Sequence, residues 1–267
     1  MSTRTSISTK LRWPNSVGHR GDVSSVYGGL RLGMQVFAGV VFTLAALPLA
    51  TAQNVLADAS VRQPYEYGVL FQGGKGLTHK RGDFKFLMAG FQGGRVLTNN
   101  VGKGILRGNF EYAVQVFPYW EALTPTFERV SLKKIPGTGI VQKSAPYPVG
   151  GTFHGVQVVP IILRWNFARH GRVVPWAQAA GGLLWTNHKF PAYGDTSSNY
   201  NTNGPNGEAS VFNFTPQGGI GVHYFTSRSR SIDLSANGVH TSSASLGDRN
   251  PGVNAGVQFS IGYTWWK

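Results

Sequence analysis

A histidine and a serine two positions apart, His240 and Ser242, have the types and spacing best suited to a chemical step. In a β-strand, residues i and i+2 project from the same face, so these two side chains can lie side by side. A histidine next to a serine hydroxyl can accept its proton and make the oxygen a nucleophile. The same spacing also arises by chance in many strands, so spacing alone leaves both interpretations open.

The residues before His240 indicate which face of the strand it occupies. Its own face carries small or apolar residues at every second position: Gly238, Ala236, Leu234 and Ile232. The opposite face is mostly polar, with Asp233, Ser235, Asn237 and Thr241. We therefore expect His240 and Ser242 to project from a lipid-facing side near the strand end, and Asp233 to point inward. A site that faces lipid suits an acyl-chain substrate.

Strands of this kind recur along the chain and must position the pair. Runs rich in apolar, aromatic and Gly residues predict eight strands, at 66–74, 84–96, 107–121, 153–168, 173–188, 210–226, 230–243 and 253–266. The last is the clearest, because Val257, Phe259, Ile261, Tyr263 and Trp265 alternate with Gln258, Ser260, Gly262 and Thr264. The predicted fold class is all-β: an eight-stranded antiparallel up-and-down transmembrane β-barrel, which leaves no open edge in lipid. Trp265 and Trp266 are expected in its aromatic belt.

Two stretches between the predicted strands are long, at 122–152 and 189–209, and we expect them to be extracellular loops. The first is rich in Pro and Lys, and the second in Asn, Ser, Thr and Gly. Within the predicted strand 153–168, Pro160 interrupts a continuous apolar run. Because proline cannot donate to the ladder, a bulge or kink is expected there.

The N-terminal region predicts export. Gln35 to Leu49 is almost wholly apolar, Arg31 precedes it, and Ala50-Thr51-Ala52 supplies small residues for cleavage after Ala52. The apolar run is short of the roughly 20 residues that a spanning helix needs. We therefore divide the chain into an N-terminal lead and signal peptide, 1–52, and an outer-membrane β-barrel, 53–267. Residues 1–30 form a long basic lead, and initiation at Met34 is an open alternative.

Charge and residue content limit the classes of binding partner that can be expected. The formal net charge is +14, but the cations form no compact stripe and no nucleic-acid-binding module is recognisable, so no nucleic acid is expected. A basic rim instead suits an anionic membrane surface such as lipopolysaccharide. With no Cys and no histidine pair at i, i+4 spacing, neither a disulfide framework nor a metal site is expected.

The segment from His240 to Gly252, His-Thr-Ser-Ser-Ala-Ser-Leu-Gly-Asp-Arg-Asn-Pro-Gly, resembles the lipid A 3-O-deacylase family (PagL-like, also described as acyloxyacyl hydrolases). That family carries His-x-Ser-Asn-Ala, a short loop, Asn-Pro-Gly and then the last strand of an eight-stranded outer-membrane barrel. The motif match covers about 13 residues, and the strand count and signal peptide extend the agreement over the mature chain. The resemblance implies lipid A or lipopolysaccharide acyl chains as substrate, with outer-membrane lipids around the protein.

The resemblance also implies roles for single residues. Ser242 matches the family's nucleophile, and His240 matches the general base that takes the serine proton and returns it to the leaving alcohol. Asn250 matches the Asn whose side chain helps to hold the oxyanion. Ester hydrolysis by this route needs no cofactor and no metal.

Two positions depart from the family pattern. Ser243 stands where the family has Asn directly after the nucleophile, and Asn254 stands where the family has its triad acid, a Glu. Asn can fix a histidine tautomer but cannot balance the imidazolium charge. Asp248, in the preceding loop, is the alternative acid.

Three functions compete at this point. The first is an outer-membrane serine esterase that removes an acyl chain from lipid A by 3-O-deacylation, or from a similar glycolipid. The second is a non-catalytic structural or adhesive barrel of the same fold, which Asn254 keeps open. The third, a small porin or transporter, ranks last because eight strands leave little lumen. Phe212 and Phe214 could line an acyl groove or belong to the aromatic belt.

Overall fold

A computed structural model describes residues 54–57, 63–78, 81–130, 132–168, 171–190, 210–244 and 254–267. The predicted lead and signal peptide, 1–52, lie outside the described residues. Among those described, the one helix is the short 3-10 turn η1 (Gly104–Leu106). No helix in these segments is long and apolar enough to cross a membrane.

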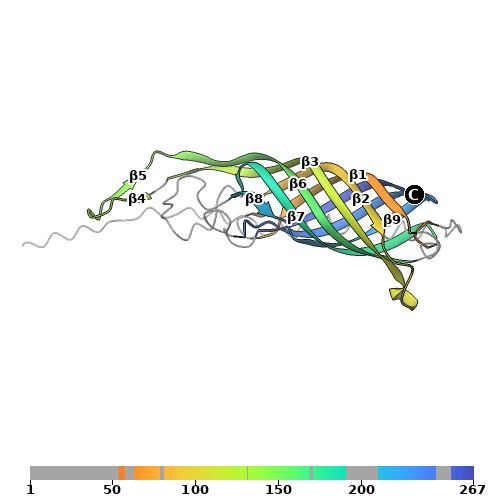
Figure 1. The fold of residues 1–267 in the computed structure, drawn as a ribbon. Helices are drawn as coiled ribbons and strands as arrows, with labels where there is room; N and C mark the ends of the chain where they lie inside the picture. The colour runs from red at the N-terminus through yellow and green to blue at the C-terminus, as the bar shows by residue number, and fades with distance from the viewer. Residues whose placement is uncertain are drawn as a thin grey trace, which may run out of the picture. The chain divides into compact units, whose positions relative to one another are not determined.

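The described chain is built almost wholly of antiparallel strands (Figure 1). They are β1 (Tyr65–Gly76), β2 (Lys85–Val96), β3 (Gly108–Arg129), β4 (Leu132–Lys134), β5 (Val141–Lys143), β6 (Tyr147–Phe167), β7 (Val173–Phe190), β8 (Ser210–Phe214), β9 (Gln217–Ser227), β10 (Arg230–His240) and β11 (Ala255–Trp266). Each long strand pairs with the next in the chain, β11 pairs with β1, and β6 pairs with β7. The sheet therefore closes on itself as an up-and-down barrel, which confirms the predicted fold class.

The predicted strand 210–226 is formed by β8 and β9, which are interrupted at Thr215 and Pro216. The pairing continues in the same register across the interruption: Phe214 lies opposite Leu183 and Ser242, and Gln217 lies opposite Ala180 and Val239. Pro216 lacks an N–H but its carbonyl still accepts the His240 N–H at 3.0 Å. The two segments therefore form one continuous barrel strand. We call each such strand, whether interrupted or not, a stave, and the barrel has eight staves.

The expectation of a loop at 122–152 was wrong in large part. β3 runs on to Arg129 and β6 begins at Tyr147, and the two remain paired over that length, while β4 and β5 form a small hairpin beyond them (Figure 1). Pro125, which suggested a loop, lies at a register shift between Thr124 and Phe127. Pro118, within the predicted strand 107–121, lies at another between Phe117 and Trp120. A bulge leaves a residue outside the ladder, so it accommodates a residue that cannot donate.

Pro160 confirms the bulge expected from the sequence. The pairing of β6 with β7 shifts register between Val158 and Ile161, which flank it. The carbonyl freed there is not left without a partner, because Tyr112 Oη donates to Pro160 O at 2.5 Å. The strand therefore continues past the proline with a local irregularity.

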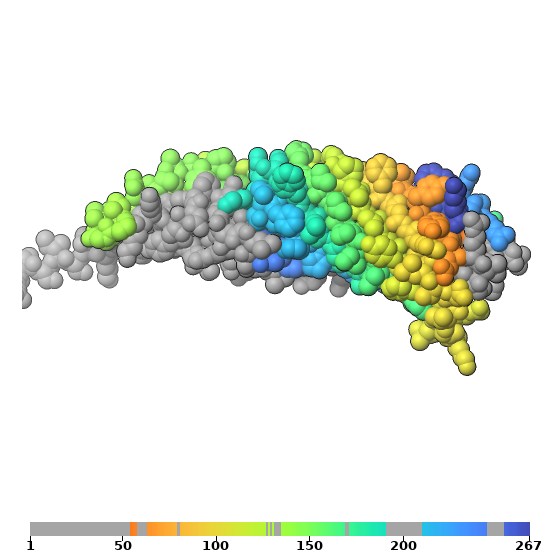
Figure 2. Space-filling view, viewed as in Figure 1, coloured from red at the N-terminus to blue at the C-terminus, as the bar shows by residue number. Residues whose placement is uncertain are grey.

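Along the strands, buried and exposed positions alternate. Unlike the strands of a soluble β-sandwich, these strands turn many polar side chains inward and large apolar side chains outward. Inward positions carry many of the buried polar side chains: Glu66, Gln72, Glu111, Gln115, Gln157, Arg164, His223, Asp233, Asn237, Gln258 and Thr264. Outward positions expose large apolar side chains: Tyr67, Phe71, Leu87, Phe91, Val116, Leu123, Ile161, Leu163, Trp185, Ile220 and Ile261. Figure 2 shows one side of this outer surface, where β2, β3, β6 and β7 form a continuous wall. The alternation predicted for the last strand is confirmed, and Asp233 points inward.

Adjacent tryptophans at the end of β11 separate to opposite faces. Trp265 faces outward and stacks on Tyr67, with ring centroids 5.8 Å apart. Trp266 is 3% exposed and its Nε1 donates to Ser231 Oγ at 3.0 Å inside the barrel. Its expected place in the aromatic belt was therefore wrong, because successive residues of a strand must point to opposite faces.

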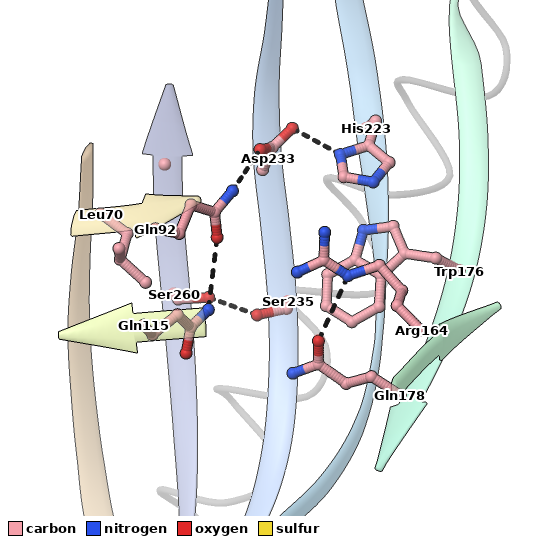
Figure 3. A pocket seen from close by; sticks show the side chains of 11 residues that line it. Leu70, Gln92, Gln115, Arg164, Trp176, Gln178, His223, Asp233, Ser235 and Ser260 are labelled. Atoms are coloured by element: carbon pink, nitrogen blue, oxygen red, sulfur yellow. Dashed lines mark hydrogen bonds and ion pairs between the residues drawn. The ribbon is translucent and has the colours of Figure 1, made fainter. Parts of the chain in front are cut away.

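The interior is filled by a charged and hydrogen-bonded network. Arg164 Nη1 donates to Glu66 Oε1 at 3.1 Å and to Glu111 Oε1 at 3.0 Å, and its guanidinium lies over the Trp176 ring. Farther along, His223 Nδ1 lies 2.8 Å from Asp233 Oδ1 (Figure 3). The cavity between these groups measures about 20 Å³, which is room for about one water molecule.

The segment Asn54–Ala57 closes one end of the bore. Asn54 Nδ2 donates to Gly171 O at 2.6 Å, and Val55 N donates to Arg228 O at 3.2 Å. The Leu56 side chain is fully buried in an apolar cluster with Val96, Val174, Phe225 and Trp266. We call this the turn end; β2, β6 and β9 finish here, and β3, β7 and β10 begin here. At the opposite end, which we call the loop end, β1, β3, β7 and β10 finish, and β2, β6, β8 and β11 begin.

Candidate functional site

His240 and Ser242 lie at the loop end of β10, where that strand finishes. His240 is the last residue of β10 and pairs with Ala255 of β11. Burial alternates up to this point, with Asn237 and Val239 buried and Gly238 exposed. His240 and Ser242 are both half-buried and share the outward register of Gly238. Both residues therefore lie on the outward register that the sequence pattern predicts.

The backbone of Ser242 is held by β8. Phe214 N donates to Ser242 O at 2.6 Å, and Ser242 N donates to Phe214 O at 3.0 Å. The His240 N–H is held in turn by the carbonyl of Pro216. His240 and the next outward residue, Ser242, are therefore held through their backbones by the neighbouring stave. No sequence pattern predicted this role of Phe214 and Pro216.

A tight turn follows the serine. The Ala244 N–H donates to Ser242 Oγ at 3.1 Å, and Ala244 has φ of +48°, in the left-handed region. Among the described residues, Ala244 is the one non-glycine residue with positive φ. A side-chain oxygen that accepts from the N–H two residues on is typical of serine-initiated turns. Non-glycine residues in the left-handed region are concentrated at functional sites, so the turn is consistent with a functional role for Ser242.

The Asn254 side-chain nitrogen, at the family's acid position, is not hydrogen-bonded to His240. The Asn254 backbone carbonyl accepts the Thr241 N–H at 2.8 Å, so Asn254 lies opposite Thr241, on the register that points inward. The side chain is 3% exposed, and its Nδ2 has no hydrogen-bond partner among the described residues. Asp248 and Asn250 lie outside the described residues.

The outward surface beside the pair is apolar and open. Phe212 and Phe214 of β8 pack edge to face, with ring centroids 5.6 Å apart, and Phe212 and Trp185 are exposed. Next to them Gly218 and Gly238 are paired, and a Cβ added to either would meet nothing closer than 3.7 Å. Neither glycine therefore carries a side chain that would cover the wall at this point. The described residues contain no cluster of three His, Asp or Glu that could hold a metal.

Fold and site together define a closed eight-stave barrel with an outward Ser–His pair at its loop end. The model of the lipid A 3-O-deacylase (PagL) family matches residues 110–264, a range that includes His240, Ser242 and Asn254. The chain belongs to this family, which confirms the resemblance seen in the motif. No curated protein matches the chain in sequence.

Solved structures with a similar arrangement of strands include three from bacterial barrels. The crystal structure of the outer membrane enzyme PagL is 14% identical and aligns over 74% of this chain and 98% of its own, with a TM-score of 0.33. The N-terminal β-barrel domain of Pseudomonas aeruginosa OprF is 11% identical over 75% and 97%, with a TM-score of 0.36. The outer membrane protein OprG from Pseudomonas aeruginosa is 8% identical over 77% and 96%, with a TM-score of 0.38.

Proposed function

We propose that the protein is an outer-membrane serine esterase that hydrolyses an acyl ester of lipid A, by 3-O-deacylation, or of a similar glycolipid. The observation that carries the proposal is the place of His240 and Ser242 on the outward face of a barrel of this family. A nucleophile that faces lipid meets an acyl chain without drawing it into an interior already filled by side chains.

The membrane location is supported by the outer surface. Exposed aromatic and aliphatic side chains cover the outward positions, and polar groups are turned inward, as lipid requires. At the turn end, Tyr67, Tyr263 and Trp265 form an aromatic cluster that suits a membrane interface. The longer connections gather at the opposite end, where outer-membrane barrels have their extracellular loops. Export by a signal peptide cleaved after Ala52 completes this proposal.

The mechanism follows from the chemistry of the pair. Ser242 Oγ attacks the ester carbonyl while His240 accepts the hydroxyl proton, and the same proton then passes to the leaving sugar hydroxyl. Water releases the acyl group from Ser242 by the reverse sequence of proton transfers. Asn250, matched to the family's Asn-Pro-Gly, would donate to the oxyanion of both intermediates. No step requires a metal or a cofactor.

The proposal is tested by mass spectrometry of lipid A from a host that expresses the full chain. Wild-type protein should remove the mass of one hydroxyacyl group, and Ser242→Ala should abolish the loss. Ser227→Ala is a matched control, because Ser227 is exposed at the far end of β9. If lipid A is unchanged although the barrel is folded in the membrane, the esterase assignment to this substrate is wrong.

A non-catalytic barrel of the same fold is the second candidate, and Asn254 favours it. A neutral side chain whose Nδ2 is not hydrogen-bonded to His240 cannot balance an imidazolium charge. A fluorophosphonate probe separates the two functions, because it labels an activated serine whatever the natural substrate. Labelling of wild-type protein but not of Ser242→Ala supports the esterase. If neither protein is labelled, the non-catalytic barrel is supported.

A further inference from the structure

Two lysines lie directly opposite one another on the outer face of the barrel. Lys75 is the second-last residue of β1, Lys85 is the first of β2, and the register pairs them. Both project outward, on the same registers as Phe71 and Leu87, with Lys75 half-buried and Lys85 exposed. Like charges directly opposed across a sheet destabilise the pairing, so this arrangement calls for a compensating anion.

No described side chain supplies that anion. Within the segments that the structure describes, neither Lys75 nor Lys85 forms a salt bridge or a hydrogen bond through its side chain. The acid on the outward face of the adjoining β3, Glu121, accepts instead from Tyr119 Oη at 3.0 Å and lies 3.4 Å from His154 Nδ1. The two ammonium groups are therefore left for a ligand or for solvent.

The lysines share one row of the wall with the strand that carries the Ser–His pair. Gly238 lies opposite Val257, Val257 opposite Lys75, and Lys75 opposite Lys85. His240 is the next outward residue after Gly238, toward the loop end. At a strand spacing of about 4.8 Å, the backbones of β10 and β1 are about 10 Å apart and those of β10 and β2 about 14 Å apart.

We infer that Lys75 and Lys85 form a binding subsite for a phosphate on the sugar of the glycolipid whose ester is presented to Ser242. The inference rests on the proposed function and adds the anionic group by which the substrate is recognised. One phosphate between the two ammonium groups removes their repulsion and gains two charge-assisted hydrogen bonds. Flexible lysine stems let the charged heads rise toward the headgroups while their methylenes stay against the apolar wall.

The test measures binding of lipid A to Ser242→Ala protein in detergent micelles, so that bound substrate is not consumed. Bis-phosphorylated lipid A is compared with lipid A from which both phosphates have been removed. Lys75→Gln with Lys85→Gln should weaken binding of the phosphorylated form by about fivefold per lysine, or about 25-fold together. Lys75→Arg with Lys85→Arg should retain binding. Lys103→Gln with Arg107→Gln removes two exposed cations at the turn end and should change nothing.

The dephosphorylated lipid should bind the Ser242→Ala protein more weakly, and the lysine substitutions should not weaken it further. Equal binding of phosphorylated lipid A by the Lys75→Gln, Lys85→Gln protein overturns the inference. So does the same loss with phosphatidylglycerol micelles, because the lysines would then hold any anionic headgroup. If binding depends on the lysines but the wild-type protein is inactive, the phosphate subsite is supported and the esterase proposal is wrong. If the wild-type protein cleaves lipid A but binding does not depend on the lysines, the esterase proposal is supported and the subsite is wrong.

Discussion

Phe214 and Ser242 exchange both of their backbone hydrogen bonds, at 2.6 and 3.0 Å, across two strands that meet beyond Pro216. The candidate nucleophile is therefore positioned by a neighbouring stave as well as by the strand that bears it. β10 ends at His240, two residues before Ser242. The pairing with Phe214, the last residue of the short strand β8, therefore holds the Ser242 backbone where β10 itself has ended.

Replacement of Phe214 by proline should reduce ester cleavage by about 100-fold while the barrel remains folded. Proline removes the N–H that holds the Ser242 carbonyl, and a displacement of about 1 Å at a nucleophile costs about that factor. Rates on a short-chain nitrophenyl ester measure the effect, and heat-modifiable mobility in gels reports the fold. Phe214→Ala keeps the N–H and serves as the control. Equal rates for both variants would show that the pairing does not position Ser242.

Removal of the charge from Asp248 should reduce turnover far more than removal of the Asn254 amide. Asn254 lies on the inward register, and its Nδ2 is not bonded to the imidazole, so Asn254→Ala should cost less than tenfold. Asp248→Asn should cost up to about 10⁴-fold if that carboxylate orients His240, as the same change does in a serine protease. The initial rates of lipid A deacylation decide between them. A large loss for Asn254→Ala with little for Asp248→Asn would restore Asn254 as the orienting group.

Arg164 should be the most sensitive interior residue for stability. Both of its carboxylate partners, Glu66 and Glu111, have fully buried side chains. Arg164→Leu leaves those two groups in the bore without their cation, which costs about 3–5 kcal/mol in buried pairs. Urea unfolding in micelles, followed by tryptophan fluorescence, measures the loss. Arg164→Leu combined with Glu66→Gln and Glu111→Gln should recover part of the stability, and Lys103→Gln should stay within about 0.5 kcal/mol of wild type.

The barrel should not conduct ions. Its cavity of about 20 Å³ is lined by Arg164, Trp176, His223 and their neighbours, and Leu56 closes the turn end. A bore of this size holds about one water molecule and cannot pass a hydrated ion. Purified protein in planar bilayers should therefore give no stepwise conductance. Regular steps that increase with protein concentration would return the porin interpretation to consideration.

Local periodicity predicted the strands and their faces but not their full length. The alternation around His240 and along β11 depends only on neighbours in the sequence, and the structure bears it out. The extension of β3 and β6 was missed because Pro125 and its neighbours read as loop residues. Whether a proline ends a strand or occupies a bulge depends on the partner strand, which the composition of one segment does not reveal.

The contacts between side chains in the barrel interior could not be predicted from the sequence either. Arg164 meets Glu66 across 98 positions and Glu111 across 53, and both distances in sequence become contacts only when the barrel closes. The same holds for Lys75 and Lys85, whose opposition follows from the register of β1 on β2. Motif spacing places Ser242 and His240, whereas the groups that surround them depend on how neighbouring strands are aligned.

The burial of Asn54 and Leu56 imposes an order on assembly. Asn54 donates to Gly171, which lies 117 positions farther along the chain, and Val55 donates to Arg228. Leu56 packs against Phe225 and Trp266, which lie near the other end of the chain. Most of the staves must therefore be aligned before the first residues of the barrel domain can find their place. The segment Asn54–Ala57 should therefore be among the last to settle, and its protection from proteases would time the completion of the closed barrel.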